Sequence, residues 1–177
     1  MPTGYTWART GIRAVIRRED KKNRRINVLG AYAPCGAAPD LLWQTQTGKI
    51  DAQVLLEFVC ARLAGLPQGA AQLALPPAGW RRVRPCTVVL DNASAHVAHA
   101  FKDHRSELQA VGVELFYLPP RSPELNRIER VWRSAKYEDY PHRSQASLED
   151  LGRAVDEALI RQRTRIRGCA HDLPEAA

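Results

Sequence analysis

The chain has few of the residues that mark disulfide scaffolds, zinc modules or membrane proteins. It holds four cysteines, and no two of them form a Cys-x-x-Cys pair. They are Cys35, Cys60, Cys86 and Cys169. This spacing disfavours a structural zinc site and favours reduced, partly buried thiols. No apolar run approaches the length of a membrane span, and the polar, arginine-containing start is unlike a signal peptide. We therefore expect a cytoplasmic protein with no membrane partner.

Acidic residues are also in the minority. The 26 Lys and Arg residues exceed the 19 Asp and Glu residues, which gives a net charge of +7 and a pI of about 9.6. Lysine supplies only 5 of the 26 basic residues, so arginine, with 21, carries the excess. Guanidinium groups match phosphate geometry and stack on bases, so this balance favours a nucleic-acid partner. A GC-rich genome would also favour arginine over lysine, but it would not explain the positive net charge.

Length and hydrophobic patterning indicate one globular α/β domain. Strand-like segments come first, and helical and strand-like segments alternate after them. The expected strands are 11–17, 25–32, 41–47, 86–90 and 113–118, with the first two forming a hairpin. The expected helices are 51–64, 94–111, 122–137 and 147–163. Ser147 and Asp150 resemble a capping box at the start of the last helix. The pattern alone leaves several α/β folds open.

An acidic residue follows the most apolar of these strands. Cys86–Leu90 is a short, near-continuous apolar run, which predicts a strand buried on both faces. Asp91 and Asn92 stand at its end. Taken alone, an Asp-Asn pair at this place commonly caps the next turn. A carboxylate at a strand's end also suits a metal site for phosphoryl transfer when a second acid is available.

A second acid lies beyond a stiff proline corner. The segment Tyr117–Trp132 reads as a strand end, a corner and a helix, in which Ser122 can cap and Pro123 fits the first helical position. This reading places Glu129 about two turns into a rigid helix. Taken alone, such a glutamate would be solvent-exposed and paired with Arg133 at i+4.

These two blocks resemble the catalytic region of the IS630 and Tc1/mariner transposases. The signatures of that family are an apolar strand ending in Asp-Asn with a histidine a few residues on, then Leu-Pro-Pro-Tyr-Ser-Pro-x-Leu-Asn-Pro-Ile-Glu-x-x-Trp. They are matched by Val88–His96 and Leu118–Trp132, with Arg121 in place of the usual Tyr and Arg127 in place of the usual Pro. Similarity at Tyr5–Gly11, which resembles the family's Trp-Ala-x-x-Gly segment, extends the match from Gly4 to about Leu159.

The resemblance implies a ribonuclease H-like fold, a mixed sheet flanked by helices, that performs DNA transposition. Asp91 and Glu129 would be two of three catalytic acids and would bind Mg²⁺ or Mn²⁺. The family's first acid lies in an Asp-Glu pair upstream of the Trp-Ala-x-x-Gly segment, but only six residues precede Trp7 and none is acidic. We therefore expect an N-terminally truncated domain over residues 1–166 that lacks the first central strand, has impaired activity, and is followed by a disordered tail at 167–177.

Other residues of the two blocks have supporting roles in this interpretation. Asn92, His96, Ser122 and Asn126 belong to the motif and would act around the acids, although packing and corner formation are the simpler roles. Contacts to DNA phosphates are expected from basic residues around the Glu129 helix, with a solvated helix face as the alternative. They are Arg121, Arg127, Arg130, Arg133 and Lys136. Trp132 is expected in the core.

The expected partners are DNA, as transposon ends and target, and a second copy of the chain, near the bacterial nucleoid. No small-molecule substrate is expected. Two alternatives stay open: a non-catalytic remnant that binds DNA or an intact transposase subunit, and an unrelated ribonuclease H-like nuclease.

Overall fold

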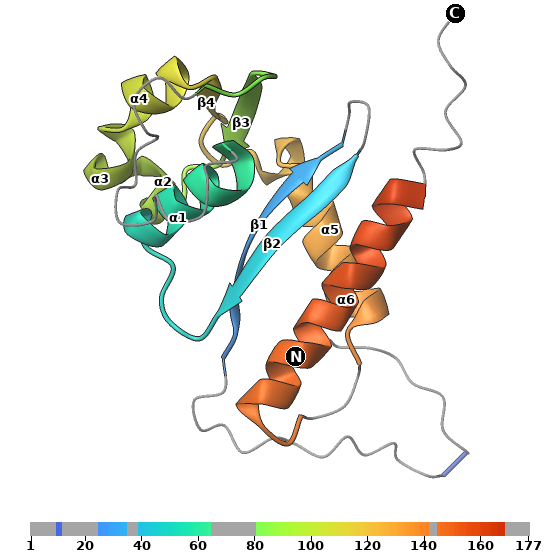
Figure 1. The fold of residues 1–177 in the computed structure, drawn as a ribbon. Helices are drawn as coiled ribbons and strands as arrows, with labels where there is room; N and C mark the ends of the chain where they lie inside the picture. Colours follow the sequence, from blue (N-terminus) through green and yellow to red (C-terminus); the bar gives the residue numbers. More distant parts are fainter. Residues whose placement is uncertain (1–9, 12–24, 35–38, 65–80, 142–144, 169–177) are drawn as a thin grey trace, which may run out of the picture. The chain divides into compact units, whose positions relative to one another are not determined.

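The computed structural model describes residues 10–11, 25–34, 39–64, 81–141 and 145–168 (Figure 1). The chain divides into two compact units. We call residues 1–47 and 127–177 the hairpin unit, and residues 48–126 the parallel-sheet unit. The chain is mixed α/β, as the sequence predicts. Outside the described residues lie most of the predicted strand at 11–17, most of the matched segment Tyr5–Gly11, residues 65–80, and the last nine residues.

The hairpin unit is built on two antiparallel strands, β1 (Asn27–Ala33) and β2 (Asp40–Gln46). Their register runs from Asn27 opposite Gln46 to Ala33 opposite Asp40. The hairpin predicted from the sequence joins 25–32 to 11–17, whereas the described partner of β1 is β2. The two strands pack against α6 and α5, which close the core of this unit (Figure 1).

Three helical segments complete the hairpin unit: α5 (Ile128–Ser134), the π-helix η4 (Ala135–Asp139) and α6 (Leu148–Gly168). Apolar residues of α5 and η4 recur at helical spacing and pack on Leu41 of β2 and Leu159 of α6. They are Ile128, Val131, Trp132 and Ala135. The predicted core position of Trp132 is therefore confirmed.

Helix α6 begins where the sequence predicts. The Ser147 hydroxyl accepts a hydrogen bond from the Asp150 backbone N–H at 3.0 Å and donates one to the Asp150 carboxylate at 2.9 Å. The predicted end near Arg163 is wrong, because the helix continues to Gly168. Its last two residues, Arg167 and Gly168, fall inside the segment that the sequence analysis assigned to a tail.

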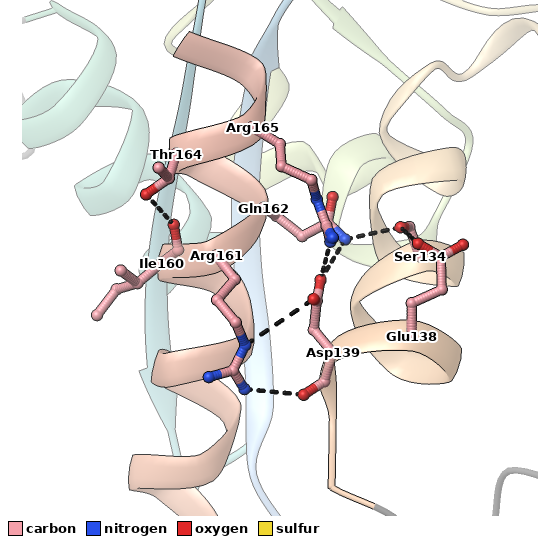
Figure 2. A network of polar contacts seen from close by, with 8 residues as sticks. All are labelled: Ser134, Glu138, Asp139, Ile160, Arg161, Gln162, Thr164 and Arg165. Atoms are coloured by element: carbon pink, nitrogen blue, oxygen red, sulfur yellow. Dashed lines mark hydrogen bonds and ion pairs between the residues drawn. The ribbon is translucent and has the colours of Figure 1, made fainter. Parts of the chain in front are cut away.

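A buried aspartate ties α6 to η4 on one border of the helix (Figure 2). The Asp139 side chain is only 6% exposed and forms ion pairs with Arg161 and Arg165. Gln162, itself buried, donates to the Asp139 carboxylate at 2.6 Å and to the Ser134 hydroxyl at 2.8 Å. The network therefore holds α6 against the segment that continues directly from α5.

The parallel-sheet unit contains strands β3 (Cys86–Leu90) and β4 (Val113–Tyr117), which pair in parallel with Leu90 opposite Tyr117. Before β3 come α1 (Ala52–Phe58), capped by the Asp51 carboxylate, and the π-helix η1 (Val59–Ala64). The core of this unit is formed by apolar residues of its helices and strands. They include Leu55, Leu56, Phe58, Val59, Phe101, Leu108, Val113 and Leu115.

Two predictions for this unit are wrong. The single helix expected at 94–111 is three short ones, α2 (Ser94–Val97), α3 (His99–Lys102) and α4 (Arg105–Ala110), because Ala98 is extended at ψ 142°. Strand β3 is not buried on both faces: Val89 is 50% exposed and its partner Phe116 55%. Alternate residues of a strand point to opposite faces, and the core of this unit covers only one of them.

Among the described residues, no helix combines the length and apolar character needed to span a bilayer.

Candidate active site

The carboxyl ends of β3 and β4 are joined by two hydrogen bonds. The Leu118 backbone N–H donates to the Leu90 carbonyl at 2.8 Å, and the Asn92 side-chain amide donates to the Leu118 carbonyl at 2.7 Å. Asn92 thus links the two strand ends immediately after Asp91 and restrains the backbone there. The carboxyl ends of parallel strands are the edge at which α/β proteins place their ligands.

The Asp91 carboxylate is anchored through one of its oxygens. Asp91 Oδ1 accepts a hydrogen bond from the Ala93 N–H at 3.0 Å and lies 2.6 Å from His96 Nδ1. No described residue forms a hydrogen bond with Oδ2, and the side chain is 42% exposed. The turn-capping role considered for Asp91 is therefore observed, but it occupies only one oxygen and leaves the other for a cation or water.

His96 faces Asp91 through one ring nitrogen. Its Nδ1 lies near both the carboxylate and the Asp91 backbone carbonyl, at 2.6 and 3.1 Å, so we assign the hydrogen to Nδ1. In the neutral ring, Nε2 is then the acceptor nitrogen. The ring is 19% exposed. His96 therefore acts on the orientation of Asp91 and has a second nitrogen for another partner.

Tyr117 is a supporting residue that the sequence analysis missed. Its hydroxyl donates to the His96 backbone carbonyl at 2.9 Å. Burial raises the pKa of the Tyr117 hydroxyl, which keeps it a donor at neutral pH. The register of β3 and β4 accounts for this role, because Tyr117 lies opposite Leu90, the residue that precedes Asp91.

The helix start predicted at Ser122 is wrong. Ser122 makes no capping hydrogen bond, and Pro123–Leu125 form only one turn of 3₁₀-helix, η3. Asn126 then turns extended, with φ −86° and ψ 93°, so α5 begins at Ile128. Arg121 at the corner has φ 59°, a left-handed conformation that is uncommon for a residue with a side chain. Pro123 and Asn126 thus shape a corner, while a separate helix carries Glu129.

Glu129 lies in the first turn of α5, not two turns into a helix. It is exposed, and no described residue contacts its carboxylate; the i+4 pair with Arg133 considered above is not formed. The apolar side of α5 faces the core, so the glutamate is held on a helix packed firmly against β1 and β2. Asp91 belongs to the parallel-sheet unit and Glu129 to the hairpin unit, and the structure positions each acid within its own unit.

The predicted DNA-contact residues are exposed side chains in both units. Arg127, Arg130, Arg133 and Lys136 lie on or beside α5 and η4, and Arg121 lies at the corner in the parallel-sheet unit. Lys136 Nζ lies 5.5 Å from the centre of the exposed Tyr137 ring.

Residues 1–152 match the model of a protein family described as DDE superfamily endonuclease. The chain belongs to this family. The matched segment includes both motif blocks, with Asp91 and Glu129. No curated protein and no solved structure matches the chain.

Membership of the DDE superfamily supports a transposase-like or nuclease-like function on DNA. Domains of this superfamily generally use divalent metal ions, and oxygen ligands are those that Mg²⁺ prefers. Asp91 Oδ2 and the Glu129 carboxylate are ligands of that kind. Within the described part of the chain, no three His, Cys, Asp or Glu side chains converge into one metal-binding group.

Proposed function

We propose that this chain is a transposase catalytic domain of the IS630/Tc1-mariner type, with a ribonuclease H-like fold over residues 1–166. It would cleave DNA at transposon ends and join it to a target, with Mg²⁺ or Mn²⁺. The observation that carries the proposal is the Asp91 carboxylate at the end of β3, anchored through Oδ1 and without a hydrogen bond at Oδ2 from any described residue. The two matched motif blocks supply the family context.

Each residue of the blocks has a specific role in the proposal. Asp91 and Glu129 bind the cation, while His96 and Asn92 orient Asp91. Ser122 and Asn126 shape the corner that precedes α5. The bound cation would neutralise charge on the phosphate and activate the attacking water or 3′-hydroxyl. Exposed arginines around Glu129 would contact DNA phosphates without reading base sequence.

Asp91 and Glu129 are two candidate catalytic acids, whereas the family has three. The resemblance carries the family's first acid onto none of the 177 residues. Two carboxylates would bind a single cation weakly, so we expect little or no turnover from this polypeptide. The second candidate function is a non-catalytic protein that binds DNA or an intact transposase subunit, and the net charge of +7 supports it as well.

Incubation with a labelled DNA end and Mg²⁺ or Mn²⁺ separates the two candidates, because only a catalyst nicks the strand. If nicking occurs, Asp91→Asn and Glu129→Gln should abolish it. Glu124→Gln is the matched control, since Glu124 is an exposed acid of the same motif in the η3 turn and should be dispensable. Nicking that survives Asp91→Asn would refute the assigned site. Cleavage of an RNA–DNA hybrid instead of DNA would indicate an unrelated ribonuclease H-like nuclease.

Metal binding can be measured even without turnover. Titration with Mn²⁺, followed by electron paramagnetic resonance, should show a weak site that Asp91→Asn removes and Glu124→Gln retains. Equal Mn²⁺ binding by the wild type and Asp91→Asn would exclude Asp91 as a ligand.

A further inference from the structure

The positive charge of α6 is concentrated in its C-terminal half. Four arginines lie between Ala158 and Gly168, and that stretch contains no acid. They are Arg161, Arg163, Arg165 and Arg167, with side chains 33–54% exposed. The N-terminal half is acidic, with Glu149, Asp150, Asp156 and Glu157 against Arg153 alone. Basic residues near a helix C-terminus complement the helix dipole, but that effect is small and confined to the last turn.

One arginine pair shares a single carboxylate. Arg163 donates Nε and Nη2 to the two oxygens of Asp40 at 2.7 and 2.8 Å, and Arg167 does the same at 2.9 and 2.8 Å. Each guanidinium thus binds Asp40 through one edge, and its Nη1 forms no hydrogen bond with a described residue. Two positive charges against one negative charge leave the cluster at +1.

An aromatic ring, together with the shared carboxylate, restricts the movement of the Arg163 guanidinium. Arg163 lies over the Trp43 ring, with its guanidinium carbon 5.9 Å from the ring centre. Trp43 is fixed in turn by a 2.9 Å hydrogen bond from its Nε1 to Asp156. Asp156 lies seven residues before Arg163, about 10 Å along the helix, so it does not neutralise the cluster by contact. A ligand that binds these arginines would find them already ordered, which lowers the entropic cost of binding.

A second pair of arginines, Arg161 and Arg165, shares the buried Asp139 on the other border of α6, and both remain about half exposed (Figure 2). Arg161 donates Nη2 to the Asp139 backbone carbonyl at 2.8 Å and has its Nε 3.8 Å from the carboxylate, whereas Arg165 pairs with the carboxylate through Nη2. One guanidinium would suffice to neutralise each aspartate. Both aspartates have two, so each of these two groups contains one more positive than negative charge.

We propose that the C-terminal half of α6 binds the phosphodiester backbone of DNA through the outward edges of these arginines, above all Arg163 and Arg167. The planar guanidinium suits phosphate oxygens, and two arginines one turn apart span about 6 Å along the helix. Binding would not depend on base sequence, since the surface offers charge and N–H donors only. The inference rests on DNA being the substrate in the proposed function.

The test is binding of a fluorescent DNA duplex in EDTA, measured by anisotropy over a range of salt concentrations. Arg163→Gln with Arg167→Gln should weaken binding and reduce the slope of log K against log salt by about 2, one unit per lost phosphate contact. Arg153→Gln is the matched control, because it removes an exposed, ion-paired arginine from the acidic half of α6 and should not change that slope. Equal slopes for the double variant and this control would overturn the proposal.

Two further variants distinguish the loss of DNA contacts from the loss of the fold. Arg163→Lys with Arg167→Lys keeps both charges and should retain most of the salt slope. Asp40→Asn removes the shared acid and keeps both arginines, so the slope of log K against log salt should be at least as steep as for the wild type despite lower stability. A shallower slope for folded Asp40→Asn would overturn the proposal. EDTA removes divalent cations, so DNA binding in this assay does not depend on a cation bound by Asp91 and Glu129. Absence of DNA binding by the wild type would instead refute DNA as partner in both proposals.

Discussion

Replacing Gly30 by alanine would place a methyl group where the ring of Trp132 already lies. Gly30 is in the middle of β1, and an added Cβ would overlap Cη2 of Trp132 and lie 2.8 Å from its Cζ2. The Leu42 carbonyl oxygen would be 3.3 Å away on the paired strand. The indole ring packs against the core cluster of the hairpin unit and the carbonyl belongs to a strand backbone, so neither can move aside freely.

The expected change in the free energy of unfolding of Gly30→Ala is the sum of two opposing effects. Overpacking a core by one methyl group costs about 1–3 kcal/mol. Replacing glycine by alanine lowers the entropy of the unfolded chain and returns about 0.4–1 kcal/mol. We therefore expect Gly30→Ala to lower the free energy of unfolding by about 1–2 kcal/mol. For a chain of this size that corresponds to a drop in Tm of about 2–8 °C.

Urea denaturation, followed by the fluorescence of the tryptophans, would measure this change. Gly152→Ala is the control with opposite sign, since Gly152 is inside α6 and the nearest atom to an added Cβ is Ile26 Cδ1 at 3.9 Å. Removing a glycine from a helix interior should raise the free energy of unfolding by about 0.5–1 kcal/mol.

A double-mutant cycle tests the physical cause. Trp132→Phe removes the outer ring atoms that would clash, so Gly30→Ala should cost at least about 0.5 kcal/mol less in that background. Strictly additive effects of the two substitutions, or a Gly30→Ala variant as stable as the wild type, would refute the reasoning.

Three further predictions concern buried or paired groups. Asp139→Asn should lower the free energy of unfolding by about 1–3 kcal/mol, because Gln162 and the arginines lose a charged acceptor; an unchanged urea midpoint would contradict this. Hydrogen bonds from its two arginines hold the pKa of Asp40 well below its usual range. The stability that these ion pairs contribute is therefore present above about pH 4 and lost as the pH falls further. The difference in free energy of unfolding between the wild type and Asp40→Asn should stay constant from about pH 6 to pH 4 and narrow as the pH falls to about 2.5, as measured by urea melts. Burial raises the pKa of the Cys60 thiol to about 11, so peptide mass spectrometry should find Cys60 unmodified by iodoacetamide at about pH 8 unless urea is added.

One of the two helix starts predicted from side-chain capping is confirmed. Ser147 caps α6 as predicted, because a capping box is decided by residues three positions apart, whereas Ser122 caps no helix. Asp51, expected as the first residue of its helix, is the cap of α1. Apolar patterning likewise located β3 and β4, and with them the strand end that carries Asp91.

Continuity of a helix was predicted less well. The sequence around Ser122 and Pro123 has the features of a helix start, but the same features also suit a single 3₁₀ turn. The extended backbone of Asn126 decides between the two, and it shifts Glu129 into the first turn of α5. Ala98 interrupts the expected helix after Asp91 in the same way, although alanine favours helices by propensity. Packing outweighs such weak preferences.

By itself, the sequence determined the α/β class, the placement of Asp91 after an apolar strand, the helical setting of Glu129, and the arginine excess that indicates DNA. Only the tertiary structure decided which partners these groups have. Arg163 and Arg167 bind Asp40 across 123 and 127 residues of chain, and the Trp132 ring packs on Gly30. Contacts at such separations leave no periodic pattern in the sequence, because they form when packed elements bring distant side chains together.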